Sequence, residues 1–259
     1  RFLLGNLNDK LLNDDFSKIE YSKLSSLEKY ILTQVYDFDL RFRDYIKSYN
    51  FHKIYIELLN FCTLDLSAFY FDIKKDILYC DSENSQRRNN CLEILNVLIN
   101  FLLKWFSPIL AFTSEEAYQV IKNKKYKSIH LQDFPVIPLM WNNSEIKNKW
   151  IGIKKVKQVV NADIEDIRNK KIIGSSLEAN VIVYLKDEYL NIIKQEDLSE
   201  IFICSEAKAE SFINQNDLFS LKDVEGVAVK ILKAKGQKCS RCWKILEKPC
   251  SRDICGLKN

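Results

Sequence analysis

Four cysteines lie close together near the end of the 259-residue chain: Cys239, Cys242, Cys250 and Cys255. The first two form a Cys-x-x-Cys pair, a spacing at which a tight turn lets both thiolates reach one tetrahedral metal ion. Cys250 and Cys255 supply two further thiols. Four thiolates at about 2.3 Å from Zn²⁺ would fold a segment that is too short to have a core of its own. The pattern therefore predicts one zinc ion in this tail.

Two other interpretations of the cysteines are open. They could be free thiols on a frayed tail, or a redox pair of the thioredoxin kind, which would need Cys-x-x-Cys at the start of a helix in a βαβ setting that is absent here. The other four cysteines are scattered and mostly flanked by apolar residues: Cys62, Cys80, Cys91 and Cys204. A secreted disulfide framework would instead spread its cysteines through a short, loop-rich chain. The distribution favours a reducing cytosol and a metal site.

Other chemistry-bearing patterns are missing from the sequence. It contains neither a G-x-x-x-x-G-K-[ST] loop nor a G-x-G-x-x-G turn, the two glycine-rich motifs that bind phosphate groups. His52 and His130 lie far apart, with no paired nucleophile in sequence. Nothing in the sequence therefore resembles an active site.

The composition indicates a folded, helix-rich protein. Hydrophobic residues make up 47% of the chain, and only 6 Gly and 4 Pro are present, which favours long helices. No apolar run reaches the roughly 18 residues that span a bilayer. The net charge of +4 is compatible with nucleic-acid binding but does not require it. The start at Arg1 lacks Met, so we expect a piece of a longer protein.

Helical periodicity dominates the first half of the chain. One apolar stripe, which predicts a long helix, consists of Leu24, Leu27, Ile31, Val35, Phe38, Phe42, Tyr45 and Tyr49. Ser25 and Glu28 form a capping box at its start. Further helices are expected from about Phe51 and from about Ser85, the latter ended by Pro108. Thr113 and Glu116 are expected to cap a shorter helix. Together these segments predict an antiparallel helix bundle.

The second half alternates between helix and strand signals. An amphipathic helix is predicted over residues 145–170 and a short one over residues 187–194. Three β-branched apolar runs predict strands: 181–185, 201–203 and 227–229. This half is therefore expected to form a small α+β domain.

Several motifs together resemble one family, the bacterial-type isoleucyl-tRNA synthetases. Segments similar to its anticodon-binding bundle are Arg1 to Leu7, Asn60 to Cys62 with Asp65 to Tyr70, and Pro108 to Glu116. Ile173 to Ala179 is similar to the hallmark of its junction domain, and Cys239 to Trp243 to its terminal zinc knuckle. The resemblance implies three parts: an anticodon-binding bundle with its connector at 1–142, an α+β junction domain at 143–235 and a zinc knuckle at 236–259.

The resemblance also implies a function. The full-length family member is a class I ligase that activates isoleucine with ATP, esterifies it to tRNA(Ile) and edits its errors. The catalytic signatures H-x-G-H and K-M-S-K-S are absent from this sequence, and so is an editing domain, so this piece alone is expected to be inactive. ATP would be used only by the catalytic domain. The implied partners are tRNA(Ile) and the catalytic and editing domains of the same polypeptide, in a cytoplasmic monomer that binds no membrane.

The tail departs from the family pattern at one position. The second zinc pair of the family is Cys-x-x-Cys; Cys255 resembles its first half, and the closing cysteine would fall on Lys258. Either Cys250 takes the fourth place, which we favour, or three thiolates and a water hold the metal, or the metal is lost.

The same resemblance suggests which residues contact tRNA. Arg41, Arg43, Arg87 and Arg88 are candidates for phosphate contacts, because Lys and Arg follow the RNA backbone. For Arg87 and Arg88 a solvated helix end is an equal alternative. Trp243 either packs the small knuckle or stacks on an anticodon base, with Arg241 beside it as a cation.

Two rival functions remain open at this point. The chain could be a stand-alone zinc-knuckle module that binds nucleic acid without ligase activity, as in DNA glycosylases with similar knuckles. It could also be a purely structural helical protein.

Overall fold

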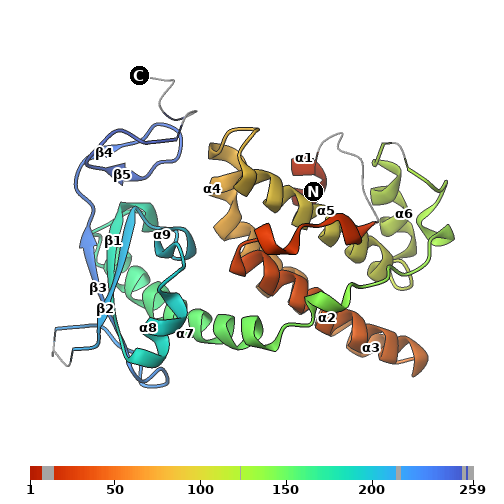
Figure 1. The fold of residues 1–259 in the computed structure, drawn as a ribbon, viewed down its shortest axis with the longest axis horizontal. Coiled ribbons are helices and arrows are strands. Elements are labelled where there is room, and N and C mark those ends of the chain that lie inside the picture. Colours follow the sequence, from red (N-terminus) through yellow and green to blue (C-terminus); the bar gives the residue numbers. More distant parts are fainter. Residues whose placement is uncertain (8–14, 123, 214–216, 253–254, 256–259) are drawn as a thin grey trace. The chain divides into compact units, whose positions relative to one another are not determined.

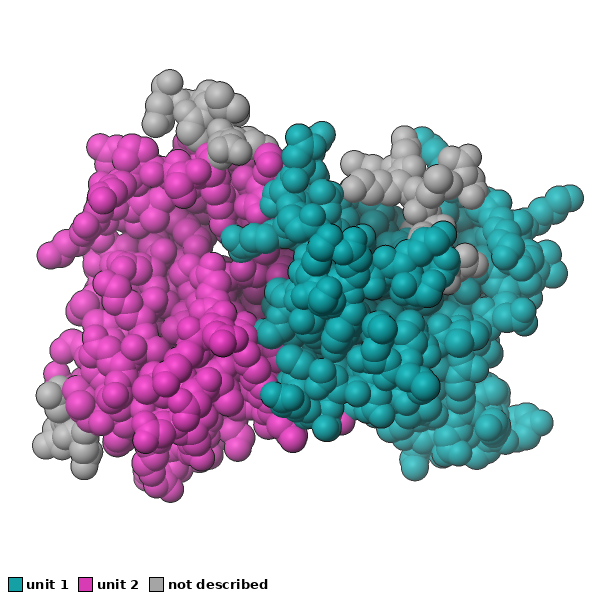
Figure 2. Space-filling model, in the orientation of Figure 1, with its two compact units in different colours: residues 1–72, 83–146 teal, residues 73–82, 147–259 magenta. Residues whose placement is uncertain are grey.

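The computed structural model describes residues 1–7, 15–122, 124–213, 217–252 and 255. Figure 1 shows helices in the first part of the chain and small sheets confined to the last part. The chain forms two compact units, which are distinguished by colour in Figure 2. The first comprises residues 1–72 and 83–146, and the second comprises residues 73–82 and 147–259. The mainly helical fold with a small α+β region, predicted from the periodicity, is confirmed.

The first unit is a helical bundle. Its main elements are α1 (Phe2–Leu7), α2 (Ser26–Lys47), α3 (Phe51–Asn60), the π-helix η3 (Phe61–Phe71), α5 (Gln86–Phe106) and α6 (Ala111–Gln119). Short 3-10 turns lie before α2 and after α6: η1 (Phe16–Lys18), η2 (Tyr21–Lys23), η4 (Ile129–Leu131) and η5 (Leu139–Trp141). Helix α5 contacts α1, α2 and α6, and is therefore the central helix of this unit.

Local capping explains where two of these helices begin. Glu28 N–H donates to the Ser25 side chain, and the Glu28 carboxylate accepts from Ser25 N–H at 2.8 Å, so the predicted capping box is confirmed. Helix α5 begins at Gln86, close to the predicted start at about Ser85, and Ser85 is its N-cap. Helix α6 begins at Ala111 without a side-chain cap, so the predicted cap at Thr113 is wrong. Tyr49 is also not part of the buried stripe, since it follows the end of α2 and is 81% exposed.

An aromatic cluster forms the core of the bundle. The ring centroids of Phe38 and Trp105 lie 4.6 Å apart in an edge-on arrangement, and those of Phe101 and Trp105 lie 5.2 Å apart. The buried Asp39 accepts a hydrogen bond from Trp105 Nε1 at 2.9 Å and pairs with Arg43 at 2.5 Å. The buried indole N–H of Trp105 and the carboxylate of Asp39 are thereby satisfied.

A continuous helical stretch, Phe51–Cys80, joins α3, η3 and α4 (Asp72–Cys80). An 18-residue window within it has a mean hydropathy of 1.2, and a third of that window is buried. By length and composition this stretch could cross a membrane, so the expectation that no segment reaches that limit is wrong. The same test is passed by core helices of soluble proteins, and Ile54, Leu58 and Leu66 of this stretch are buried in the protein.

The second unit is built on a three-stranded sheet in the order β2-β1-β3. Its elements are α7 (Ser144–Asn169), η6 (Ser176–Glu178), β1 (Ala179–Leu185), α8 (Asp187–Ile193), α9 (Leu198–Ile201), β2 (Glu206–Ser211) and β3 (Val227–Lys233). Strand β1 pairs in parallel with β2, through the α8–α9 crossover, and antiparallel with β3. Gly152 on α7 lets that helix pack closely on α8, because a Cβ there would lie 2.4 Å from Ile192.

One predicted strand is wrong. Ile201 ends helix α9, and Phe202 and Ile203 form the turn that follows it, with Ile203 at φ 55°. The second strand of the sheet is β2, a little further along the chain. Ile201 and Phe202 are nevertheless buried, so the apolar run predicted burial correctly and conformation incorrectly.

Candidate functional site

A two-stranded ribbon, β4 (Gln237–Lys238) and β5 (Ile245–Leu246), carries the Cys-x-x-Cys pair on its turn. Cys239 N–H donates to Lys244 O at 2.9 Å, and Trp243 N–H donates to Cys239 O at 3.0 Å. Trp243 closes this turn in the left-handed region, at φ 63°. Gly236 at φ 122° precedes the ribbon, where a Cβ would lie 2.1 Å from Leu246 O, so no larger residue fits there.

The turn brings Cys239 and Cys242 together with Cys250 and Cys255. The four Sγ atoms all lie within 4.8 Å of one another, with Cys242 and Cys255 buried and the other two half-buried. Four sulfurs at about 2.3 Å from a common tetrahedral centre would lie roughly 3.8 Å apart. The cluster therefore has the donors and the spacing to hold a metal ion. Cys250 belongs to it, and Lys258 lies outside the described residues.

The thiols differ in how easily they ionise. Burial opposes ionisation of Cys239, but hydrogen bonds from the backbone N–H groups of Cys242 and Arg241 outweigh it and lower the pKa of Cys239 to about 7. Burial raises the pKa of Cys242 to about 12 and also raises that of Cys255. A bound cation reverses this balance, since metal binding deprotonates its thiol ligands.

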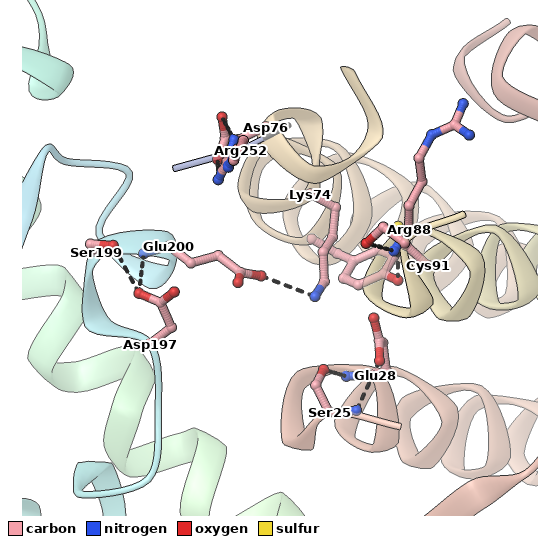
Figure 3. A network of polar contacts seen from close by, with 12 residues as sticks. Ser25, Glu28, Lys74, Asp76, Arg88, Cys91, Asp197, Ser199, Glu200 and Arg252 are labelled. Carbon is pink, nitrogen blue, oxygen red and sulfur yellow. Dashed lines mark hydrogen bonds and ion pairs between the residues drawn. The ribbon is translucent and has the colours of Figure 1, made fainter. Parts of the chain in front are cut away.

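The knuckle, defined here as residues 236–252 with Cys255, docks on the end of helix α4. The Arg252 guanidinium forms two hydrogen bonds to the Asp76 carboxylate, at 2.8 and 2.5 Å, and its Nε lies 3.5 Å from Asp81 Oδ1. Arg241 donates from Nη2 to Tyr79 O at 2.7 Å. Figure 3 shows the Asp76–Arg252 pair on α4, and beside it Lys74, which pairs with Glu200 at 3.0 Å.

The exposure of Trp243 distinguishes it from Arg241. The indole is 60% exposed, and Lys238 Nζ lies 5.9 Å from the ring centroid. The Arg241 side chain is directed to α4 through its bond to Tyr79. The two side chains that sequence analysis grouped as one RNA contact thus have different surroundings.

The four bundle arginines that were predicted to contact RNA also differ in their surroundings. Arg41 pairs with Glu57 at 2.8 Å and donates to Asp37 O at 3.0 Å. Arg43 pairs with Asp39 and donates to Pro135 O at 2.7 Å, which ties the connector to α2. Arg87 and Arg88 lie in the first turn of α5, with Arg87 exposed and Arg88 half-buried.

Comparison with known proteins identifies the family. The model of the family described as "Anticodon-binding domain of tRNA ligase" matches residues 28–183, more than half of the chain. The chain belongs to this anticodon-binding family of tRNA ligases. The match runs from the start of α2 through the bundle and α7 into strand β1.

Relatives of this anticodon-binding chain are isoleucine–tRNA ligases, which confirms the resemblance. The chain is 46% identical to the isoleucine–tRNA ligase of Pelagibacter ubique (strain HTCC1062) over 252 residues, which are 97% of the chain and 27% of the relative. It is 38% identical over 246 residues to that of Agrobacterium fabrum, and 38% identical over 245 residues to that of Bartonella quintana. These matches cover 95% and 94% of the chain. The chain spans about a quarter of the length of these relatives, 27%, 25% and 25%.

The docking residues of this anticodon-binding chain were not predicted from the sequence. Asp76 and Arg252 lie 176 positions apart, and neither belongs to a recognisable motif. Lys238, next to Cys239, was also missed as a partner of Trp243. A local signal existed for Asp81, the second acid near Arg252, because an acidic residue at the C-terminal end of a helix is unfavourable unless a cation accompanies it.

Proposed function

We propose that the chain recognises tRNA(Ile) through the anticodon stem-loop, as the C-terminal recognition part of an isoleucine–tRNA ligase. The observation that carries this proposal is the anticodon-binding family match over residues 28–183. The similarity to isoleucine–tRNA ligases over 97% of the chain supports the isoleucine assignment. Activation of isoleucine with ATP, transfer and editing then belong to other domains of the same polypeptide.

The cysteine cluster would hold one Zn²⁺ through Cys239, Cys242, Cys250 and Cys255. An all-sulfur tetrahedral donor set is the set that structural zinc prefers. The sulfur spacing and the place of Cys250 within the cluster support four protein ligands over three and a water. The bound ion would supply no chemistry beyond folding the knuckle and fixing its turn.

Trp243 would stack on a base of the anticodon loop. A non-glycine residue in the left-handed region costs about 1–3 kcal/mol, and an indole that is 60% exposed regains little of that by packing. Stacking on an unpaired base would compensate, since every base offers an apolar face to an aromatic ring. Lys238, which lies over the ring, adds a positive charge for the adjoining phosphate.

The arginines would contribute in different ways. Arg87 and Arg88 are proposed as phosphate contacts at the start of α5. Arg41 and Arg43 already pair with Glu57 and Asp39, so they would support the tRNA-binding surface mainly by holding its elements in place. Arg241 likewise acts through the knuckle's attachment to α4.

A binding titration tests this proposal. The zinc-loaded chain is titrated with unmodified and native tRNA(Ile), and with a tRNA of similar length that accepts another amino acid. We expect a clear preference for tRNA(Ile). Equal affinity for all tRNAs and for an unrelated stem-loop would instead support the rival, a zinc-knuckle module that binds nucleic acid without regard to anticodon.

A further inference from the structure

The contact between the knuckle and helix α4 pairs one arginine of the knuckle with two acidic residues of the α4 segment. Asp76 lies in the middle of α4, and Asp81 directly follows the helix, where the helix dipole disfavours negative charge. Arg252 contacts both carboxylates, and holds the pKa of Asp76 below its usual range although burial opposes this. The acids and the arginine therefore compensate each other only while the knuckle is docked.

The second contact uses the same end of the helix. Tyr79 O is one of the last carbonyls of α4, which have no partner within the helix, and it accepts from Arg241. Cys80 is buried against Cys242 and Cys255, and its Sγ lies 3.9 Å from Arg241 O. In the sequence, Arg241 lies between Cys239 and Cys242 and two residues before Trp243. A shift of this contact therefore moves the indole directly.

Zinc and the α4 contact thus have separate tasks. Four thiolates fix the internal shape of the knuckle, but they leave its orientation on the rest of the unit undetermined. The orientation comes from Arg252 and Arg241 on α4, since the β4–β5 ribbon is only two residues long on each side. Lys244 and Ile245 add hydrogen bonds to Ser199 and Ser205, at 3.2 and 2.7 Å.

We propose that Asp76 is a positioning residue for tRNA recognition: through Arg252 it fixes the knuckle on α4, and so presents Trp243 to the anticodon loop in one orientation. This inference rests on the proposed function, and it adds a residue far from Trp243 in sequence to the recognition machinery. Asp76 itself needs no contact with RNA.

The test compares Asp76→Asn with the wild-type chain, both loaded with zinc. Asparagine keeps the shape of the side chain but removes the charge that binds Arg252. We expect one zinc per chain in both proteins, faster hydrogen exchange at the amides of residues 237–246 in the variant, and tRNA(Ile) binding weakened by about 10-fold. The matched control, Glu225→Gln, breaks the exposed Lys186–Glu225 pair in the same unit and should change none of these.

A double-mutant cycle with Trp243→Ala decides whether Asp76 acts through the indole. If it does, Asp76→Asn costs little further affinity once Trp243 is absent, because the two effects are not additive. Strictly additive losses, loss of zinc in Asp76→Asn, or exchange and affinity both unchanged would each overturn the proposal.

The exchange measurement keeps this proposal separate from the proposed function. If the wild-type chain fails to bind tRNA(Ile), the proposed function fails and the positioning role fails with it. Faster exchange in Asp76→Asn would still show that the ion pair holds the knuckle. If the wild-type chain binds and exchange is unchanged, only the positioning role is wrong.

Discussion

At the scale of single residues, Cys204 and Cys250 show how environment separates two cysteines. Cys204 is fully buried beside β2, donates from Sγ to Glu206 O at 3.2 Å, and has its pKa raised to about 12 by burial. Cys250 is half-buried, with its Sγ within 4.8 Å of three other thiols. The first therefore behaves as a small core residue and the second as a candidate ligand.

Cys250→Ser should lower the zinc content, whereas Cys204→Ser should keep one zinc per chain. The knuckle has too few apolar side chains to offset the roughly 1–2 kcal/mol per residue that ordering its backbone costs, so its fold depends on all four thiolates. Elemental analysis of the two purified variants checks this. A full zinc complement in Cys250→Ser would remove that residue from the ligand set.

Trp243→Ala should keep the metal and weaken tRNA(Ile) binding by about 1–3 kcal/mol, the usual worth of one stacked base. The exposed ring contributes little to packing, so the thermal midpoint should change little. Paired titrations of wild type and variant, with zinc measured in the same samples, give the answer. Unchanged affinity would mean that Trp243 has only a structural role in the knuckle turn and does not stack on a base.

At the scale of elements, most boundaries could be predicted because they are set by local interactions. The Ser25–Glu28 box and the Ser85 cap act within four residues, so they are readable without a structure. Strand β2 was missed because it is a mostly exposed edge strand with the sequence EAKAES, which has little apolar signal. The four cysteines were found from spacing, but their docking on α4 depends on contacts more than 160 positions apart.

Helix α7 contains a buried acid, and its ionisation should destabilise the fold. Asp163 is 5% exposed, and burial, with Asp166 nearby, raises its pKa to about 6. The unfolded chain has the lower pKa, so stability is lost as pH rises from about 4 to about 6. We therefore expect Asp163→Asn to stabilise the protein by about 1–3 kcal/mol at pH 7.5 and by roughly half as much at pH 5.

Urea unfolding of wild type and Asp163→Asn at the two pH values measures this difference. Glu165→Gln is the matched control, since Glu165 pairs with Arg168 on the exposed side of the same helix and should show no such gain. Equal stability of Asp163→Asn and wild type at pH 7.5 would mean that Asp163 is ionised without cost.

At the scale of the whole molecule, the chain carries 39 basic and 35 acidic residues, and many of the described lysines and arginines are paired within it. Net charge therefore contributes little to specificity, and recognition must come from a local surface. The proposed tRNA contacts lie in the bundle and in the knuckle, and the family match covers residues 28–183 of the chain.

Binding of tRNA(Ile) should weaken steeply as salt rises. If about 4 phosphates are neutralised, log K should fall against log salt with a slope of roughly −3 for looped RNA. Arg87→Gln with Arg88→Gln should reduce that slope by about 1–2. A slope near zero in the wild-type chain would contradict phosphate contacts by these arginines.

An anticodon exchange tests whether the chain reads the anticodon of tRNA(Ile), as we propose. Affinity is measured for tRNA(Ile), for the same tRNA carrying a methionine anticodon, and for tRNA(Met) carrying the isoleucine anticodon. We predict that affinity follows the anticodon: the first exchange weakens binding by at least about 10-fold, and the second confers it, as expected when unpaired loop bases are read. Affinity that follows the body of the tRNA and ignores the anticodon would show that this chain does not recognise the anticodon.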